Sequence, residues 1–345
     1  MTAFCAFLFE HDLHHLDHLA PFCALMHIPL YTTQITVADR AQEQYPHVDV
    51  HYLPYEEAIR HLIQNYNVII SCLPTPLLEP LFFFEEYLHR KKLLFFWIGH
   101  GYSDKDVLQG LQKERFLCVY GDNMLQRLQA HKITQTAFRT ISVGNYRRHY
   151  YLQNKPFYQN SLLCQLTFPK KQKTVLFAPT WDNLDVFMEL RSLLEHWDPK
   201  YNLMVKLNPN TVLKYPELLK TLQEQFTREP HIKFVHTIST IYPLLEATDV
   251  LITDHSSIAY DFLSFDRPLI FYEKGPKQPI HTCGPLIQDV QRLPELLKVK
   301  DTHAKARQAL YASTFTPIDT FDPIKREIHK TIKDYLEQEP HLLNE

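Results

Sequence analysis

The chain has 345 residues, of which 45% are hydrophobic and 22% charged, and this composition excludes a disordered, fibrous or coiled-coil protein. Its 36 Lys and Arg residues are outnumbered by 39 Asp and Glu residues, so it lacks the basic excess of a nucleic-acid-binding protein. Its 7 glycines form neither a GxGxxG fingerprint nor a Walker P-loop. At roughly 150 residues per domain, the length predicts two domains.

The six cysteines show no CxxC spacing, and three of them lie inside apolar runs, which is typical of buried thiols in a reducing compartment. The first apolar run ends at Glu10 and has no basic flank, unlike a secretory signal. The other apolar runs are much shorter than the roughly 20 residues of a membrane-spanning helix. We therefore expect a cytoplasmic protein, or one that lies peripherally on the inner face of the cell membrane.

Short apolar runs of β-type residues alternate with amphipathic stretches along most of the chain. This alternation is typical of βαβ units and predicts an α/β fold with two parallel sheets. The expected strands are 3–9, 28–32, 67–72, 93–98, 116–120, 140–143, 174–178, 201–207, 232–236, 249–253 and 268–272. The expected helices are 55–65, 76–90, 122–131, 185–197, 214–227, 238–246, 256–264, 301–311 and 322–338. The best domain boundary lies near 150–172, where weakly periodic sequence precedes a clear strand.

In open α/β sheets, ligands bind beyond the carboxyl ends of the strands, so the residues that follow each strand are candidate site residues. In the second half of the chain, these are Thr180, Lys206, Asn208, Asp254, Ser256 and Ser257. Ser256 and Ser257 also begin a helix, where hydroxyls and unpaired backbone N–H groups favour an anion. Simple N-capping by Asp254 or Ser256 in a structural loop explains this segment equally well.

Three features of the first half are candidates for chemistry. His100 follows strand 93–98 between two glycines, where backbone freedom lets a side chain face a ligand, although a lone His is more often structural. Arg147 and Arg148 follow strand 140–143, and adjacent arginines suit phosphate. The apolar run 93–97 beside two lysines favours a buried parallel strand over a membrane-surface patch.

A histidine-rich run follows the first expected strand. His11, His14 and His18 stand three and four residues apart, so they would share one face of a helix with the spacing of metal ligands. We favour a solvated helix face instead, and therefore expect no metal site. A third interpretation is that His11 contacts a substrate, because it lies just after a strand.

Five of these segments, in order over residues 93–272, resemble motifs of the CDP-glycerol glycerophosphotransferases, the family of teichoic-acid primases and polymerases. The strongest resemblance is to Thr-Asp-Tyr-Ser-Ser followed by Phe-Asp and Arg-Pro. Its counterparts here are Thr253-Asp254-His255-Ser256-Ser257, Tyr260-Asp261 and Arg267-Pro268. The family's Trp-His-Gly-x-x-x-Lys resembles the segment from His100 to Lys105, with an extra Gly before the His.

The other three motifs are altered. The family's Gly-x-Pro-Arg-x-Asp keeps its Gly and its Arg, here Arg147, but not its Pro or Asp. Its Ala-Pro-Thr-Trp-Arg-Asp has Asp182 in place of the Arg, and its Lys-x-His-Pro has Asn208 in place of the His. Asn208 can donate a hydrogen bond but carries no positive charge, so these changes put the donor, or activity itself, in question.

The resemblance implies a GT-B-like fold, in which two Rossmann-like domains with parallel sheets face each other across a cleft and a C-terminal helix crosses back. It implies an acceptor-side domain over 1–155, a nucleotide-donor domain over 156–315, and a helix over 316–345 that packs toward the first domain. The start of that helix is marked by Asp322 and Pro323.

The resemblance also implies a transferase that moves glycerol phosphate, or another alditol phosphate, from a CDP-linked donor to an acceptor hydroxyl of a surface polymer or glycolipid. His100 would be the base, and Asp254 a second catalytic residue. Residues expected to bind the donor are Thr180, Arg147, Lys206, Asn208, Ser256, Ser257 and Asp261. On the acceptor side we expect His11 and Lys105. No cofactor or metal is expected, because the helix start would neutralise the pyrophosphate. We also expect a weak association with a membrane surface and no binding of nucleic acid.

Two alternatives stay open at this point. One is a GT-B glycosyltransferase or epimerase-like enzyme that uses a UDP-sugar. The other is a degenerate GT-B protein that binds a nucleotide or a partner without turnover. The altered motifs favour the second alternative, whereas His100 and the Ser256-Ser257 pair oppose it.

Overall fold

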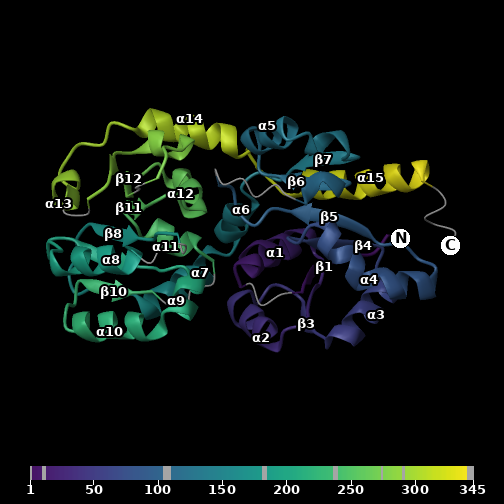
Figure 1. Ribbon diagram of the computed structural model, residues 1–345, viewed down its shortest axis with the longest axis horizontal. Helices are drawn as coiled ribbons and strands as arrows, with labels where there is room; N and C mark the ends of the chain where they lie inside the picture. The colour runs from purple at the N-terminus through teal and green to yellow at the C-terminus, as the bar shows by residue number, and fades with distance from the viewer. Residues whose placement is uncertain are drawn as a thin grey trace. The chain divides into compact units, whose positions relative to one another are not determined.

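The computed structural model describes residues 2–9, 13–103, 110–180, 185–235, 240–272, 275–289 and 292–339. The described chain divides into two compact units (Figure 1). Unit 1 takes its residues from 1–102, 106–154 and 313–345, and unit 2 from 103–105 and 155–312. The chain thus leaves unit 1 after residue 154 and returns to it at 313, where the sequence predicts boundaries after 155 and 315.

Unit 1 is built on a seven-stranded parallel sheet with the order β3-β2-β1-β4-β5-β6-β7. The strands are β1 (Phe4–Leu8), β2 (Leu30–Thr32), β3 (Val50–Tyr52), β4 (Val68–Ser71), β5 (Leu94–Ile98), β6 (Phe116–Val119) and β7 (Arg139–Ser142). The order reverses between β1 and β4, as in a Rossmann-like unit. The run expected to be a buried strand is β5, and that prediction is confirmed.

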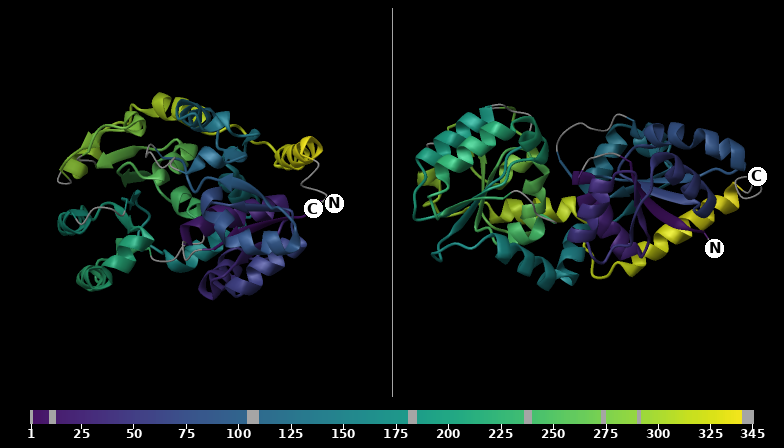
Figure 2. Two further views of the ribbon diagram at one scale, coloured as in Figure 1. Left: turned by 45° about the vertical axis from the view of Figure 1, so that its right-hand side comes forward. Right: turned by 90° about the horizontal axis from the view of Figure 1, so that it is seen from below.

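Helices of unit 1 connect successive strands, and a last helix joins them from the end of the chain. They are α1 (Leu13–Met26), α2 (Ile35–Gln44), α3 (Tyr55–Asn65), α4 (Thr75–His89), α5 (Asp122–Ala130), α6 (Tyr146–Gln153) and α15 (Asp322–Gln338). Helix α15 packs against β7, and the right-hand view of Figure 2 shows it running along unit 1. The ring of Tyr335 packs edge-on against Phe116 and Phe138, with centroids 5.0 and 4.9 Å away. The C-terminal helix therefore belongs to unit 1.

Unit 2 has a six-stranded parallel sheet with the order β10-β9-β8-β11-β12-β13. The strands are β8 (Thr174–Phe177), β9 (Asn202–Val205), β10 (Ile232–Phe234), β11 (Val250–Thr253), β12 (Leu269–Tyr272) and β13 (Leu286–Ile287). The helices are α7 (Lys155–Gln165), α8 (Asp185–Glu195), α9 (Pro209–Lys214), α10 (Pro216–Phe226), α11 (Tyr242–Glu246), α12 (Ser257–Phe262), α13 (Leu293–Leu296) and α14 (Ala304–Thr314). The strand order reverses between β8 and β11, so these two strands flank the expected ligand edge.

The cysteines that the structure describes fit the expectation of buried thiols. Cys5, Cys23, Cys72, Cys118 and Cys283 are buried and unpaired with one another. Burial raises the pKa of Cys5, Cys23, Cys72 and Cys118, which keeps these thiols protonated and unreactive.

A buried carboxyl group ties α4 to the segment before β6. Glu114 is fully buried, and it accepts hydrogen bonds from Thr75 N at 2.6 Å and Thr75 Oγ1 at 2.8 Å. Burial raises the pKa of Glu114 from its ordinary 4.5 to about 7, although the bonds from Thr75 oppose the shift. Between these pH values the folded chain holds a proton that the unfolded chain has released. This group therefore lowers the free energy of unfolding as pH rises through the window.

Replacing Glu114 with Gln is expected to remove that pH dependence, because the amide is neutral and can still accept from Thr75 N. Relative to wild type, the variant should gain about 3 kcal/mol of stability between pH 4.5 and pH 7. Denaturant unfolding of both proteins across this range measures the difference. Glu57→Gln, on the exposed face of α3, is the matched control. A constant difference between wild type and Glu114→Gln would contradict the prediction.

Candidate functional site

The carboxyl ends of β8 and β11 are joined by hydrogen bonds that continue past the strands. Ala178 N donates to Ile252 O at 3.0 Å, and Thr253 Oγ1 donates to Ala178 O at 2.6 Å. Because the strands are parallel, the loops that follow them begin at the same edge of the sheet. This edge, at the reversal of strand order, is the candidate nucleotide site of unit 2.

Asp254 connects the two loops at this edge. Its Oδ2 accepts a hydrogen bond from Thr180 N at 2.9 Å and a second one from the Thr180 hydroxyl. Its Oδ1 accepts from Ser256 N at 3.0 Å. The carboxylate thus holds Thr180 next to the start of α12, so Asp254 has the contacts of a positioning residue.

Ser256 and Ser257 stand at the start of α12, half-buried. Ser256 has the extended backbone of an N-cap residue, but its side chain makes no capping hydrogen bond. Simple capping by Ser256 therefore does not explain its hydroxyl. Further along the helix, Asp261 is buried and accepts a hydrogen bond from Tyr242 Oη at 2.7 Å. This contact orients α12 against α11, and donor binding by Asp261 stays a prediction.

Lys206 and Asn208 follow β9, the next strand along the sheet. Lys206 N donates to Phe177 O at 2.9 Å, which extends the pairing of β9 with β8. Asn208 O accepts from Thr211 N at 3.0 Å at the start of α9. Both side chains are half-buried at the edge that carries Thr180. The sheet therefore brings the expected donor residues of unit 2 to one edge.

In unit 1, three imidazole rings meet where β5 ends. The ring of His100 lies 5.3 Å from that of His14 and 4.7 Å from that of His15, measured between centroids. His14 and His100 are exposed, whereas His15 is buried. Burial, followed by the charges of His100 and His14, lowers the pKa of His15 to about 2, so this imidazole is neutral.

Tyr120, just after β6, holds the loop that carries His100. Its hydroxyl donates to Gly99 O at 2.7 Å and accepts from Gly101 N at 3.0 Å, so one oxygen fixes the backbone on both sides of His100. Gly101 has a φ of 113°, a conformation that other residues rarely adopt. The Tyr120 hydroxyl also lies 3.2 Å from Nδ1 of His18, a buried residue. Burial, above all, lowers the pKa of His18 well below its ordinary value.

The structure changes the interpretation of the histidine-rich run. The expectation of a solvated face is wrong for His15 and His18, which are 7% and 5% exposed. His18 does not join His14 in a metal-compatible group, because it faces Tyr120 inside the unit. Among the described residues, the group whose ring nitrogens could share an ion is His14, His15 and His100. His11 lies outside the described residues, as do Lys105 and Asp182.

Arg147 occupies a place that does not suit a phosphate ligand. Its guanidinium is 6% exposed, donates through Nε to Asp17 O at 3.1 Å, and forms an ion pair with Asp17 Oδ2 at 3.4 Å. Asp17 also accepts a hydrogen bond from the Tyr45 hydroxyl. The side chain therefore joins α6 to α1 inside unit 1, and the expected donor contact has no support from this geometry.

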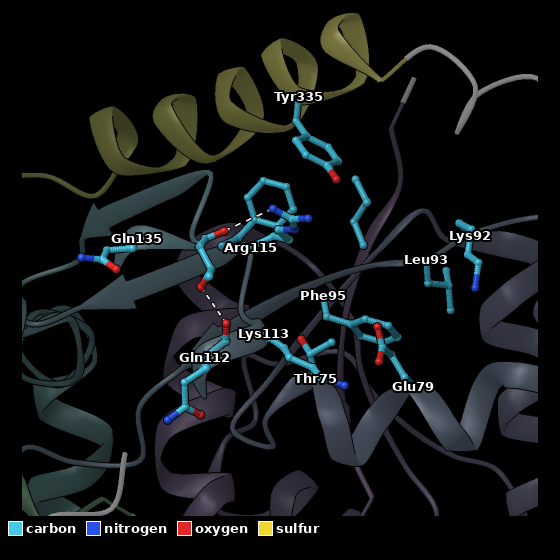
Figure 3. A pocket seen from close by; sticks show the side chains of 13 residues that line it. Thr75, Glu79, Lys92, Leu93, Phe95, Gln112, Lys113, Arg115, Gln135 and Tyr335 are labelled. Carbon is cyan, nitrogen blue, oxygen red and sulfur yellow. Dashed lines mark hydrogen bonds between the residues drawn. The ribbon is translucent and has the colours of Figure 1, made fainter. Parts of the chain in front are cut away.

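A separate pocket of unit 1 lies at the opposite edge of its sheet (Figure 3). It is lined by Leu94 and Phe116, the first residues of β5 and β6, and by Tyr335 of α15. His100 follows the other end of β5. Because the strands are parallel, this pocket is not part of the histidine site.

Comparisons with solved structures identify the class of fold. The chain matches the wall teichoic acid polymerase TagF with a TM-score of 0.65 at 16% identity, covering 97% of this chain and 90% of that one. It matches the S. aureus MnaA–UDP co-structure with a TM-score of 0.66 at 13% identity, covering 98% of this chain and 97% of that one. With two parallel α/β sheets, the chain has the GT-B fold, and that prediction is confirmed.

Sequence comparisons then confirm the family resemblance. Residues 123–282 match the profile of the CDP-Glycerol:Poly(glycerophosphate) glycerophosphotransferase family. The teichoic acid glycerol-phosphate primase of Bacillus subtilis (strain 168) is 25% identical over 279 residues, covering 70% of this chain. That match spans 65% of the primase, so the chain corresponds to just under two thirds of this relative's length. The chain is thus similar in sequence to the CDP-glycerol glycerophosphotransferases.

Proposed function

We propose that the chain transfers glycerol phosphate, or a closely related alditol phosphate, from a CDP-linked donor to a hydroxyl of a surface polymer or glycolipid. The observation that carries the proposal is the edge of unit 2 where Asp254 joins the loops after β8 and β11. This edge lies within the part of the chain that matches the family profile. The relatives, which are transferases of teichoic acid synthesis, support the same class of reaction.

The reaction requires the acceptor oxygen to attack the phosphorus that bears glycerol. A new P–O bond forms to the acceptor, and the bond from that phosphorus to the bridging oxygen breaks. The bridging oxygen leaves with CMP, and the acceptor's proton passes to a base. We assign the base to His100, whose loop is held in place by Tyr120.

The donor's pyrophosphate needs stabilisation as charge develops on CMP. In unit 2, the hydroxyls of Ser256 and Ser257, the backbone N–H groups that begin α12 after Ser256, and the Lys206 ammonium group supply it. Asp254 acts by positioning Thr180 and Ser256. Asn208 replaces a cationic donor with a neutral one, at a cost of about 1.5–3 kcal/mol for the lost charged hydrogen bond. No metal ion is needed for donor binding in this scheme.

A UDP-linked donor is the second candidate, because the similar fold of MnaA was solved with UDP. A thermal-shift panel of CDP-glycerol, CDP, CMP, UDP-N-acetylglucosamine, UDP and ADP, with and without EDTA, separates the two. A ligand at 100 times its Kd adds about 2.7 kcal/mol, which raises Tm by several degrees. The proposal predicts shifts with the CDP compounds that persist in EDTA. Shifts with UDP compounds alone would favour the glycosyltransferase, and none at all would favour the non-catalytic interpretation.

Replacing Tyr120 with Phe is expected to slow transfer by about 10- to 100-fold without weakening donor binding. The change removes the oxygen that fixes Gly99 and Gly101, so His100 loses its defined position. Tyr31→Phe is the matched control, since Tyr31 is also buried in unit 1 but its hydroxyl contacts Tyr66 at 2.9 Å and His61 at 3.1 Å rather than the loop of His100. Equal transfer rates in the two variants would contradict the positioning role.

A weak association with a membrane surface also belongs to the proposal. The described residues contain no helix long and apolar enough to cross a membrane. Helix α4, however, exposes a row of large apolar side chains, with Phe84 75% and Tyr87 77% exposed, and the exposed Arg90 follows it. Such a face suits the surface of an anionic bilayer that carries the acceptor. Phe84→Ser combined with Leu88→Ser should reduce co-sedimentation with anionic vesicles, and unchanged binding would refute this assignment.

A further inference from the structure

The side chains of His14, His15 and His100 together form a set of possible metal ligands. One ring nitrogen from each of the three side chains lies within 4.8 Å of the other two. His14 and His15 belong to the first turn of α1, whereas His100 follows β5, so the fold joins them across a long stretch of chain. Three imidazoles are a common ligand set for zinc and related divalent ions.

The geometry is close to that of a bound ion. Zinc lies about 2.0–2.1 Å from each imidazole nitrogen, which places the nitrogens of a tetrahedral site about 3.3 Å apart. The rings must therefore close by roughly 1.5 Å at most from the recorded separation. His14 and His100 are exposed, while His15 is buried.

The loop and the helix that carry these three histidines are each anchored in unit 1. The Tyr120 hydroxyl bonds both backbone groups that flank His100. Helix α1, which carries His14 and His15, is anchored by Leu16 and Leu19 on its inner face. Each of these leucines is 1% exposed. Ligands held on anchored elements lose little freedom when an ion binds, which favours affinity.

We propose that His14, His15 and His100 form a binding site for a divalent transition-metal ion such as Zn²⁺, with water in the fourth position. The site belongs to unit 1 and is distinct from the donor edge of unit 2. The ion is an inhibitor of transfer, because it occupies the imidazole of His100 that the reaction needs as base. The inhibitory role rests on the proposed function, whereas the binding does not.

Metal binding is measured on the full chain after treatment with EDTA and removal of the chelator. Isothermal titration with Zn²⁺, and Co²⁺ titration followed by its visible absorption, should each show one principal site per chain. His14→Gln and His100→Gln should each weaken that site by more than about 100-fold, because each removes a ligand. His131→Gln, at an exposed histidine of the same unit, is the matched control for scattered binding to the 20 histidines. Both ligand positions are exposed, and circular dichroism verifies that the variants fold.

Equal Zn²⁺ affinity in wild type, His14→Gln and His100→Gln would overturn the site. Where transfer is measurable, Zn²⁺ should inhibit wild type, and the Zn²⁺ concentration that halves the rate should rise more than about 100-fold in His14→Gln, measured against that variant's own metal-free rate. Binding without inhibition would overturn the inhibitory role. If no transfer occurs with any donor, the proposed function fails, and the titrations alone decide whether the metal site exists.

Discussion

His100→Ala is expected to lower the transfer rate by about 10²–10⁴-fold, the usual effect of removing a well-placed base. Donor binding should be unchanged, because the donor residues all belong to unit 2 and His100 belongs to unit 1. The measurements are CMP release for the rate and the thermal shift with CDP-glycerol for binding. An equal loss of both would mean that the variant is misfolded or that His100 contacts the donor.

The pH dependence of the transfer rate gives a second test of His100. If His100 is the base, transfer should fall on the acidic side of its profile as the imidazole becomes protonated, and that limb should be absent from the residual activity of His100→Ala. His131→Ala, an exposed histidine after α5, is the control and should leave both rate and profile unaltered. An unchanged transfer rate in His100→Ala would show that another group is the base.

Asp254→Asn is expected to weaken donor binding by about 10- to 100-fold. The amide has a single acceptor oxygen, so it cannot accept from both Thr180 and Ser256 N as the two carboxylate oxygens do, and each hydrogen bond to a charged group contributes about 1.5–3 kcal/mol. The loop after β8 would then lose its position relative to Ser256. Titration of CDP-glycerol into wild type and variant gives the two dissociation constants.

Asp249 supplies a matched control for this variant. Its Oδ2 accepts from Thr174 N at 2.8 Å, so it also joins the β11 and β8 segments, but where these strands begin. Asp249→Asn should lower the free energy of unfolding and leave donor affinity intact. If both variants bind CDP-glycerol equally well, the Asp254 edge is not the donor site.

The alternation of apolar runs was sufficient to predict most of the fold. Each buried strand of four or five residues appears in the sequence as an apolar run, as β5 and β11 do. The three-residue β3 was missed because its residues become progressively exposed along the strand and give no apolar run. Helix α1 was not expected as a buried element, because its histidines and Pro21 resemble an exposed segment although its packing buries most of it.

The candidate site was partly predictable for a physical reason. Parallel strands end at one edge of the sheet, so the direction of the strands alone places the residues after β8, β9 and β11 there. The pairing of Asp254 with Thr180 and of Arg147 with Asp17 depends on distances between segments far apart in the chain. The role of Tyr120 could not be predicted either, because nothing in its local sequence indicates which backbone groups its hydroxyl meets. The exposed face of α4 was detectable from its run of three phenylalanines, because a helix cannot bury all three consecutive side chains on one face.

The most direct measurement is the consumption of two donors by the full chain in EDTA, with membrane lipid extract as the source of acceptor. CDP-glycerol and UDP-N-acetylglucosamine are supplied separately, and the nucleotide products are resolved by ion-exchange chromatography. The proposal predicts CMP from CDP-glycerol, an equal amount of glycerol phosphate in the lipid fraction, and loss of both in His100→Ala. Consumption of the UDP-sugar in place of CDP-glycerol, or of neither donor, would contradict it.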